Sequence, residues 1–268
     1  MTIAPSPILE TLTEAQRAST LKRFAQHRQA WERNPALRSL YQTWYGRIAR
    51  ALEHAPAGPR VELGSGPGFA REFIPDLVLT DLVAAPWHDR GVSVSADALP
   101  FPDGSIGGLV MLDVLHHLAA PAAFFTEAAR ALAPGGLIVI CDPYMTPLSY
   151  PAYKFFHEEP VDLSADTVNQ DLDRGKDPFD SNQAIATLMF GRQRIAFEKR
   201  FPQFEIETVE RMAGPSYPAS GGFSRSPFLP IKLWRALAAI EGWLPQVAFR
   251  LIGFRLFVVL RKRSAPRP

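Results

Sequence analysis

Three glycines set two residues apart form the chemically most informative pattern in this sequence. The apolar segment Val61–Leu63 runs into Gly64, Gly66 and Gly68, and a helical pattern follows. Glycine suits positions where the backbone needs positive φ or must approach a ligand closely. The N–H groups at the start of a following helix face whatever lies on such a turn. The segment predicts a ligand-binding turn between a strand and a helix; the alternative is an ordinary strand–turn–helix connection.

The glycine spacing also separates classes of ligand. A dinucleotide fingerprint, G-x-G-x-x-G, would need glycine where Phe69 stands, and a phosphate-binding loop would need a Gly-Lys-Ser/Thr that the segment lacks. The neighbouring carboxylate of Glu62 would repel a pyrophosphate, whereas it suits a ligand that carries positive charge. The spacing therefore argues against an NAD-dependent oxidoreductase, which we keep as an alternative.

Acidic residues follow the next apolar stretches of the chain. Asp81 comes after the stretch that begins at Leu77, and an acid at the end of a second strand can accept both hydroxyls of a ribose. Asp97 follows the third stretch and Asp113 the fourth. The competing interpretations are a helix N-cap for Asp81 and a turn for Asp97, because aspartate favours both places.

Histidines are the candidates for acid–base chemistry. His116 and His117 follow the fourth apolar stretch, and His157 lies beyond the fifth. Histidine titrates in the range that a general base needs. The alternatives are packing under a helix start for His116 and His117, and a solvated charged loop for His157. The single cysteine, Cys141, permits no zinc cluster, and we predict no metal site.

The elements that must position these residues alternate between short strands and helices. Such alternation with continuous apolar strands predicts a Rossmann-like, doubly wound, mostly parallel α/β sheet. Ligands in such sheets bind beyond the carboxyl ends of the strands. The predicted strands are 60–63, 77–80, 92–95, 108–112 and 137–141, with helices at 70–75, 84–90 and 121–132.

Further elements flank this alternating core. Thr13 and Gln16 fit a capping box at the start of a first helix, and Pro35 fits the first position of a second helix over 34–54. The later pattern predicts helices at 181–199 and 231–244 and strands at 204–212 and 254–260.

Over residues 60–142 the ordered motifs resemble the class I S-adenosylmethionine-dependent methyltransferases, and within them the type 11 group. The glycine segment resembles their E/D-x-G-x-G-x-G signature, Asp113–Leu118 resembles their His–His pair after the fourth strand, and 131–137 resembles their Leu-x-Pro-Gly-Gly turn. One departure is Ile106-Gly107-Gly108, where the family usually has Phe-Asp.

The resemblance implies S-adenosyl-L-methionine as the cofactor, whose ammonium and sulfonium suit Glu62. It also implies a helical extension over 1–55 and a methyltransferase domain over 56–268, with insertions at about 143–200 and 213–247. Asp97 would lie at the adenine amino group with the Ala98 backbone alongside. The cofactor-binding residues that we expect are Glu62, Gly64, Ser65, Gly66, Gly68, Asp81, Asp97, Ala98 and Asp113.

The C-terminal region gives the sequence evidence on which class of acceptor is methylated. Leu233, Leu237, Ile240 and Leu244 repeat at helical spacing, flanked by Trp234 and Trp243. This helix either packs on the sheet and caps the site, or contacts a membrane surface that presents the acceptor. We expect methyl transfer, to oxygen, on a small-molecule or lipid/glycan-linked acceptor; the alternative is a non-catalytic cofactor-binding module.

The composition of the chain limits the classes of partner and the cellular compartments that we expect for it. The net charge is +2 and no concentrated basic face is evident, which argues against a nucleic-acid partner. No signal peptide is apparent, and no apolar run approaches the roughly 20 residues that span a bilayer. We expect a cytoplasmic protein, with peripheral contact at the inner face of a membrane as an option; the oligomeric state is open.

Overall fold

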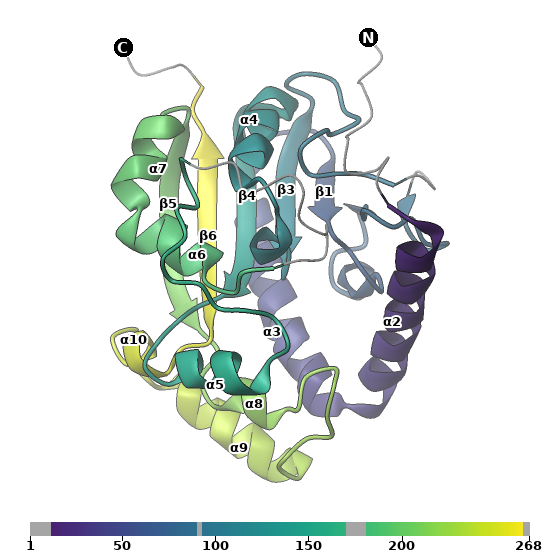
Figure 1. Cartoon of the computed structure of the whole chain (residues 1–268), viewed down its shortest axis with the longest axis vertical. Coiled ribbons are helices and arrows are strands. Elements are labelled where there is room, and N and C mark those ends of the chain that lie inside the picture. The colour runs from purple at the N-terminus through teal and green to yellow at the C-terminus, as the bar shows by residue number, and fades with distance from the viewer. Residues whose placement is uncertain (1–11, 90–92, 170–180, 265–268) are drawn as a thin grey trace.

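A six-stranded sheet forms the centre of the computed structural model, which describes residues 12–89, 93–169 and 181–264 (Figure 1). The strand order is β2-β1-β3-β4-β6-β5. Strands β2, β1, β3 and β4 pair in parallel, and β6 is antiparallel to both of its neighbours. The strands are β1 Arg60–Leu63, β2 Leu77–Leu79, β3 Ile106–Leu112, β4 Leu132–Pro143, β5 Phe204–Met212 and β6 Arg255–Lys262. The mostly parallel Rossmann-like sheet expected from the alternation is confirmed.

The central strands are apolar on both faces because both faces are covered. Alternate residues of β3 point to opposite cores, with Leu109 and Met111 in one and Val110 and Leu112 in the other. Helices α4 and α7 contribute to the first core, and α3 contributes to the second. The helices that surround the sheet are α2 Glu14–Arg33, α3 Pro35–Leu52, α4 Pro121–Ala131, α5 Ser149–Phe156, α6 Ile185–Thr187, α7 Arg194–Arg200, α8 Ser216–Ala219, α9 Ile231–Gly242 and α10 Phe249–Ile252, with short turns of other helix types at η1 Phe69–Glu72, η3 Leu115–His117 and η4 Leu188–Arg192.

The N-terminal helices begin where the sequence signals predict. Thr13 and Gln16 form the capping box of α2. The side chain of Asn34 accepts a hydrogen bond from the Leu37 N–H, and Pro35 occupies the first turn of α3. Helix α3 then packs through Trp44 and its neighbours into the same core as the sheet. The division at residue 55 stays a prediction.

Two predicted elements near the cofactor edge are wrong. The region of the predicted strand 92–95 contains only an isolated bridge between Ser95 and Ala98 among its described residues, and Val92 lies outside them. The predicted helix 84–90 is a series of turns up to residue 89. Pro86 disfavours helical backbone in the residue before it, and the Ala85 N–H donates to His88 Nδ1 within the turn.

The helix predicted over 181–199 is interrupted. It begins only at Ile185 as α6, continues as the wider turn η4, and resumes as α7 up to Arg200. Gly191 lies within η4, and glycine lowers the stability of a regular helix.

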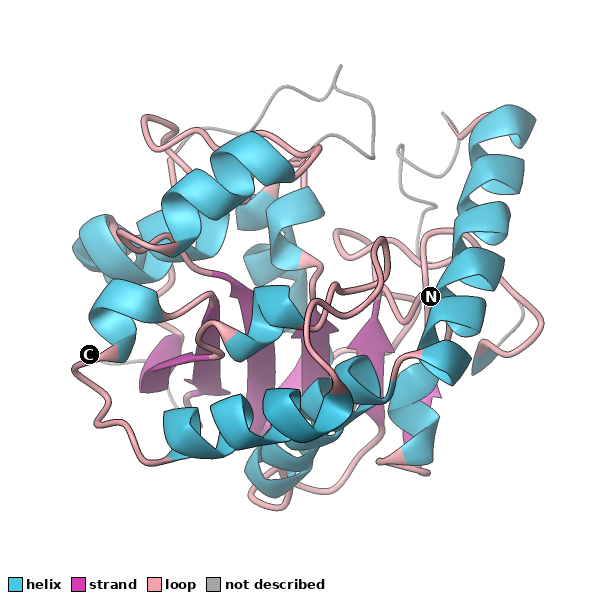
Figure 2. Cartoon of the chain, turned by 90° about the horizontal axis from the view of Figure 1, so that it is seen from below, coloured by secondary structure: helices cyan, strands magenta, loops and turns pink. Residues whose placement is uncertain are grey.

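A cap of four helices covers one end of the sheet. Helices α5, α8, α9 and α10 gather where β3 and β4 end, at the bottom of Figure 1. In a parallel sheet this is the carboxyl edge, where ligands bind. Figure 2, seen from below, shows the sheet with helices on both of its faces. Among the helices that the structure describes, none is long and apolar enough to cross a membrane.

Candidate cofactor and acceptor site

The backbone of Gly66 is held from both sides. Its N–H donates to Asp81 Oδ2 at 2.8 Å. Its carbonyl lies 2.8 Å from both Trp87 Nε1 and His88 Nε2, and Trp87 donates to it. Since His88 Nδ1 accepts the Ala85 N–H, His88 Nε2 carries the proton and donates to Gly66 as well. The glycine loop is therefore fixed by hydrogen bonds rather than free to change shape.

Gly64 has no room for a side chain. Its φ is +66°, and a Cβ built on it would lie 2.5 Å from Val114 Cγ2. Val114 immediately precedes η3, so the glycine loop is packed against the turn that carries His116 and His117. This close approach, together with positive φ, explains why glycine stands at this position.

Glu62 is a buried carboxylate with an unsatisfied oxygen. It is 1% exposed, and its Oε1 accepts a hydrogen bond from the Tyr45 hydroxyl at 3.0 Å. Its Oε2 has no hydrogen-bond partner among the described residues. Burial raises the pKa of Glu62 to about 7, although the hydrogen bond from Tyr45 lowers it. A cationic ligand would satisfy this oxygen, because a buried charge needs a partner.

Asp81 supports the loop from the neighbouring strand. Besides the bond to Gly66, its Oδ1 accepts the Val83 N–H at 3.0 Å, and burial raises the pKa of Asp81. The carboxylate thus closes a local turn and does not cap a helix, so the N-cap alternative is wrong, and the predicted contact of Asp81 with a ribose stays a prediction. Ser65 joins β1 to β2, since the Thr80 N–H donates to its hydroxyl at 3.1 Å.

Asp97 and Ala98 lie in a turn beside this edge. The Ala98 N–H donates to the Ser95 carbonyl at 3.2 Å, and the Ser95 hydroxyl donates to Asp97. The geometry agrees with the turn interpretation, and the predicted roles of both residues at an adenine stay predictions.

The carboxylate of Asp113 is already paired. It contacts the guanidinium of Arg255, whose side chain is 4% exposed, and accepts the Tyr41 hydroxyl at 3.3 Å. Arg255 also donates to the Tyr217 hydroxyl at 2.6 Å. Asp113 therefore already has a positively charged partner in Arg255. Its predicted contact with a cofactor stays a prediction. The pairing of Arg255 with Asp113 was not predicted from the sequence, because no motif near Asp113 indicates it.

Helix α2 forms a wall over the glycine loop that the sequence did not predict. Phe24 lies 3.6 Å from the position that a Cβ on Gly66 would take. Arg28 donates two hydrogen bonds to the Pro67 carbonyl, at 3.0 and 2.9 Å, and its guanidinium lies 3.9 Å from the centre of the Trp87 ring. The N-terminal helix therefore belongs to the cofactor edge of the sheet.

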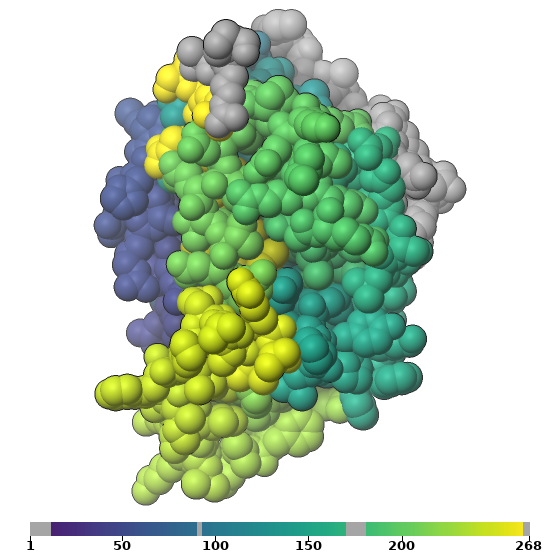
Figure 3. Space-filling model, turned by 90° about the vertical axis from the view of Figure 1, so that its left-hand side faces the viewer, coloured from purple at the N-terminus to yellow at the C-terminus, as the bar shows by residue number. Residues whose placement is uncertain are grey.

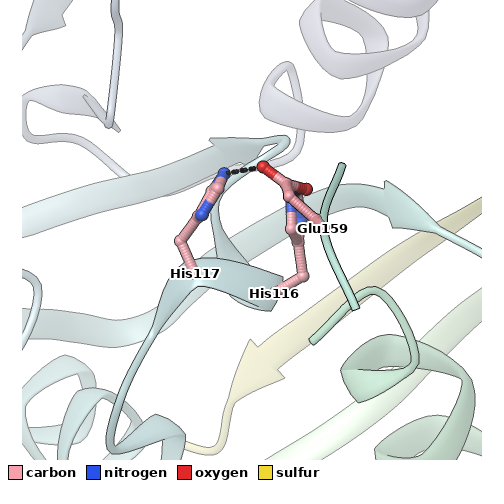
Figure 4. A group of neighbouring side chains, drawn as sticks. All are labelled: His116, His117 and Glu159. Carbon is pink, nitrogen blue, oxygen red and sulfur yellow. Dashed lines mark ion pairs between the residues drawn. The ribbon is translucent and has the colours of Figure 1, made fainter. Parts of the chain in front are cut away.

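The predicted histidines lie in one cluster, of which Figure 4 shows His116 and His117 with Glu159. His116 Nδ1 lies 3.0 Å from Asp142 Oδ1, and His116 Nε2 lies 3.4 Å from Glu159 Oε2. His117 Nε2 lies 3.6 Å from Glu159 Oε1, and His157 Nδ1 lies 3.7 Å from Glu159 Oε2. Three histidines and two carboxylates from the ends of β3, β4 and α5 thus share one place.

The pKa values of the histidines in this cluster are shifted in opposite directions. Burial lowers the pKa of His116, but the carboxylates of Asp142 and Glu159 outweigh it and raise that pKa to about 10. Burial and the charge of His116 lower the pKa of His117 to about 3. Burial also lowers the pKa of His157. Burial opposes ionisation of Glu159, yet its histidine neighbours lower its pKa to about 2.

Two members of the cluster were not predicted as site residues. Asp142 is fully buried at the end of β4, and burial raises its pKa. The switch-point rule, which directs attention to residues just after each strand, could have found it. Glu159 stands two residues after His157 and was seen only as part of a charged loop.

A cavity of about 310 Å³ lies against β5 and β6. Tyr144 lines it and accepts a hydrogen bond from Arg211 Nε at 2.8 Å. Its volume is at the low end for small-molecule sites.

Helix α9 packs through a face that is rotated from the one that its apolar repeat predicts. Leu233 and Ile240 are 58% and 62% exposed, and Trp243 is 90% exposed. Trp234 is buried, with its Nε1 donating to the Ser216 carbonyl at 2.8 Å. Glu241 is also buried and accepts hydrogen bonds from the backbone of Gly214 and Ser216. Helix α9 therefore packs into the core of the sheet through Trp234, while Leu233 and Ile240 of its apolar repeat stay exposed, because the hydrogen bonds of Glu241 fix the rotation of the helix.

Comparison with known proteins identifies the domain. Residues 61–140 match the family model described as "Methyltransferase domain", of the type 11 group. Its cofactor is S-adenosyl-L-methionine, and Glu62 fits this cation, because its buried Oε2 has no hydrogen-bond partner among the described residues. A search of curated proteins gives no match.

Solved structures with a similar overall shape have low sequence identity. A chain from the complex of the Haloferax volcanii Trm112 methyltransferase activator is 16% identical, with a TM-score of 0.49, over 97% of this chain and 99% of that one. A SAM-dependent methyltransferase from Archaeoglobus fulgidus is 15% identical, with a TM-score of 0.46, over 82% and 93%. Geranyl diphosphate C-methyltransferase from Streptomyces coelicolor is 12% identical, with a TM-score of 0.46, over 98% and 88%.

Proposed function

We propose that this chain, which carries a class I methyltransferase domain of the type 11 group over residues 61–140, methylates an oxygen of an acceptor presented at a membrane surface. The observation that carries the catalytic part is the buried carboxylate oxygen of Glu62 beside the glycine loop, which has no hydrogen-bond partner within the described part of the chain. When bound, S-adenosyl-L-methionine supplies a methyl group on a cationic sulfur that is already activated. The chain has therefore to orient the two reactants and to remove a proton from the acceptor.

The residues of the chain divide these tasks between two places. Glu62 offers its carboxylate to the positive charge of the cofactor, and Asp81, just after β2, accepts hydrogen bonds from the hydroxyl groups of its ribose. Orientation of this kind contributes up to ~7–11 kcal/mol to lowering a barrier. His117 is 33% exposed and uncharged, so its imidazole can accept a hydrogen bond from an acceptor hydroxyl, whereas His116 holds a proton between two carboxylates.

The surface of the cap supports a lipid-linked or otherwise apolar acceptor. Most of the large apolar side chains that are exposed in the described part of the chain lie on 148–158 and 214–252, which we call the apolar cap surface. Figure 3 shows α9 and α10 in yellow-green beside the teal of α5 on this end. The members are Leu148, Phe155, Phe156, Phe228, Leu233, Ile240, Trp243, Val247 and Leu251.

The charges on the same segments match an anionic lipid surface. The exposed cations outnumber the exposed acids, of which these two segments contain only Glu158. Apolar side chains interleaved with cations are typical of interfacial helices. The exposed cations are Lys154, Arg225, Lys232, Arg235 and Arg250. Because the cap lies at the carboxyl edge of the sheet, a membrane held there would bring its lipids near the cofactor.

The test is transfer of an isotope-labelled methyl group. The chain is incubated with methyl-labelled S-adenosyl-L-methionine and, separately, with the organic-extractable and the water-soluble fractions of the source cells. We expect label in an organic-extractable product, held in a methyl ether or ester, and loss of the label with Glu62→Gln. Label only in water-soluble products would contradict the membrane acceptor, and calorimetric binding of S-adenosylhomocysteine with no label in either fraction would favour a non-catalytic module.

A further inference from the structure

We propose that His116, His117 and Glu159 bind one divalent transition-metal cation, with Zn²⁺ as the first candidate. The ligand atoms of these three side chains all lie within 4.8 Å of one another. Figure 4 shows the two imidazoles and the carboxylate turned toward one another. Two histidines and one carboxylate form a ligand set found in catalytic zinc and non-haem iron sites.

The spacing suits coordination to a shared cation. Zinc–ligand bonds of ~2.0–2.1 Å in a tetrahedron place neighbouring ligand atoms about 3.4 Å apart. The Nε2 atoms of His116 and His117 lie 3.4 and 3.6 Å from the nearest Glu159 oxygens. These separations exceed those of good charge-assisted hydrogen bonds, which are about 2.7–2.9 Å. The separations between the histidine nitrogens and the two Glu159 oxygens are thus closer to those between ligands of one cation than to those of strong hydrogen bonds.

A buried carboxylate holds His116 in the orientation that a metal ligand needs. Asp142 is fully buried, and its Oδ1 lies 3.0 Å from His116 Nδ1. This contact fixes the ring so that Nε2 points toward Glu159. The other oxygen of Asp142 has no hydrogen-bond partner among the described residues. The side chain of Gln183 donates a hydrogen bond to Glu159. In metal-binding histidines, the ring N–H that does not face the metal typically donates a hydrogen bond to such a carboxylate.

The site would leave a coordination position for an oxygen ligand. Three side chains of the described residues supply the candidate ligand atoms, and those of His117 and Glu159 are 33% and 24% exposed, so small molecules can reach them. Three protein ligands with an open position are typical of catalytic rather than structural zinc. The turn that carries both histidines begins directly after Val114, which packs against Gly64. An acceptor oxygen bound there would be a hydroxyl made more acidic by the cation, a use that rests on the proposed function.

Direct binding tests the site without any acceptor. Tag-free protein is stripped with a chelator and titrated calorimetrically with ZnCl₂, while CoCl₂ reports the coordination by visible absorption. We expect one equivalent of Zn²⁺ and a Co²⁺ spectrum typical of four or five ligands. His117→Ala and Glu159→Gln should each weaken Zn²⁺ binding more than about 10-fold, and so should Asp142→Asn. His54→Ala, which removes an exposed histidine elsewhere, should bind as the wild type does, and MgCl₂ should give no comparable heat, because Mg²⁺ prefers oxygen ligands.

Calorimetry with S-adenosylhomocysteine on the same samples keeps the result interpretable. A variant that binds this ligand normally is folded, so its loss of Zn²⁺ affinity would report the ligand itself. Wild-type protein that binds S-adenosylhomocysteine but no Zn²⁺, or equal Zn²⁺ affinity in wild type, His117→Ala and Glu159→Gln, would overturn the metal site and leave the methyltransferase proposal standing. Zn²⁺ binding without S-adenosylhomocysteine binding would support the metal site and count against the proposed function.

Discussion

The two halves of the carboxyl edge are built in different ways. At the cofactor half, Glu62 and the glycines come from one short segment, and most of the contacts involve backbone groups. At the acceptor half, the cluster around Glu159 joins side chains from η3, from the end of β4 and from the loop after α5. The first half is rigid and local, whereas the second depends on how distant segments fold together.

This difference predicts where substitutions act. A change in the glycine loop should alter backbone conformation, and with it the fold and cofactor binding together. A change in the acceptor half should remove one side-chain function and leave the loop intact. The following substitutions test that contrast.

Gly64→Ala should have the largest effect. The added methyl group meets Val114 and also forces a non-glycine residue into positive φ, so we expect a loss of about 2–5 kcal/mol in the free energy of unfolding. Urea denaturation measures it. Gly104→Ala is the matched control, since Gly104 has a φ of +63° and no atom within 4 Å of an added Cβ. It should cost only about 1–2 kcal/mol, and equal losses would contradict the close packing at Gly64.

Glu62→Gln should change the pH dependence of stability. Burial raises the pKa of Glu62 from 4.5 to about 7, so between these values the folded chain holds a proton that the unfolded chain has lost. The stability that this proton provides is present below pH 4.5 and is lost as the pH rises to 7, by about 3 kcal/mol.

Urea denaturation of wild type and Glu62→Gln across that pH range isolates this contribution. Relative to the variant, the wild type should lose stability as the pH rises, because glutamine cannot release a proton. Parallel pH profiles of the two proteins would show that Glu62 titrates normally in the folded chain.

Asp81→Asn should weaken cofactor binding with a smaller effect on folding. Asparagine keeps the shape of the side chain, but an NH₂ group takes the place of one carboxylate oxygen, so one charged hydrogen bond is lost. Such bonds contribute about 1.5–3 kcal/mol. We expect the calorimetric Kd for S-adenosylhomocysteine to rise roughly 10- to 150-fold. Asp76→Asn is the control, since Asp76 is exposed and pairs with Arg60 at the opposite end of β1 and β2; similar losses in both variants would indicate a general charge effect.

Trp243→Ala should have the smallest effect, and only on membrane contact. Removing one exposed aromatic side chain from the apolar cap surface should cost about 1–2 kcal/mol of vesicle binding, or roughly a 5- to 30-fold weaker partition. Flotation with anionic lipid vesicles measures it. Ile195→Ala removes a side chain that is 70% exposed on α7, outside the cap, and should float as the wild type does. If neither the wild type nor the variants float, the membrane acceptor is wrong.

Local patterns predicted the sheet and the glycine loop because their information lies in neighbouring residues. The strand 204–212 and the start of α3 at Pro35 follow directly from alternation and capping. The partnership of Asp113 with Arg255 could not be predicted, since it depends on β6 lying beside β4. The rotation of α9 could not be predicted either, because the backbone groups that Glu241 satisfies belong to another segment.

The position of β6 between β4 and β5 also constrains biosynthesis. On the ribosome, β5 is made before β6, yet it has no place in the sheet until β6 has paired with β4. Until Lys262 has emerged, the outer edge of β4 and both edges of β5 stay open to pairing with other chains. The sheet can therefore close only after its last strand has been synthesised, and until then these edges are exposed to misassembly.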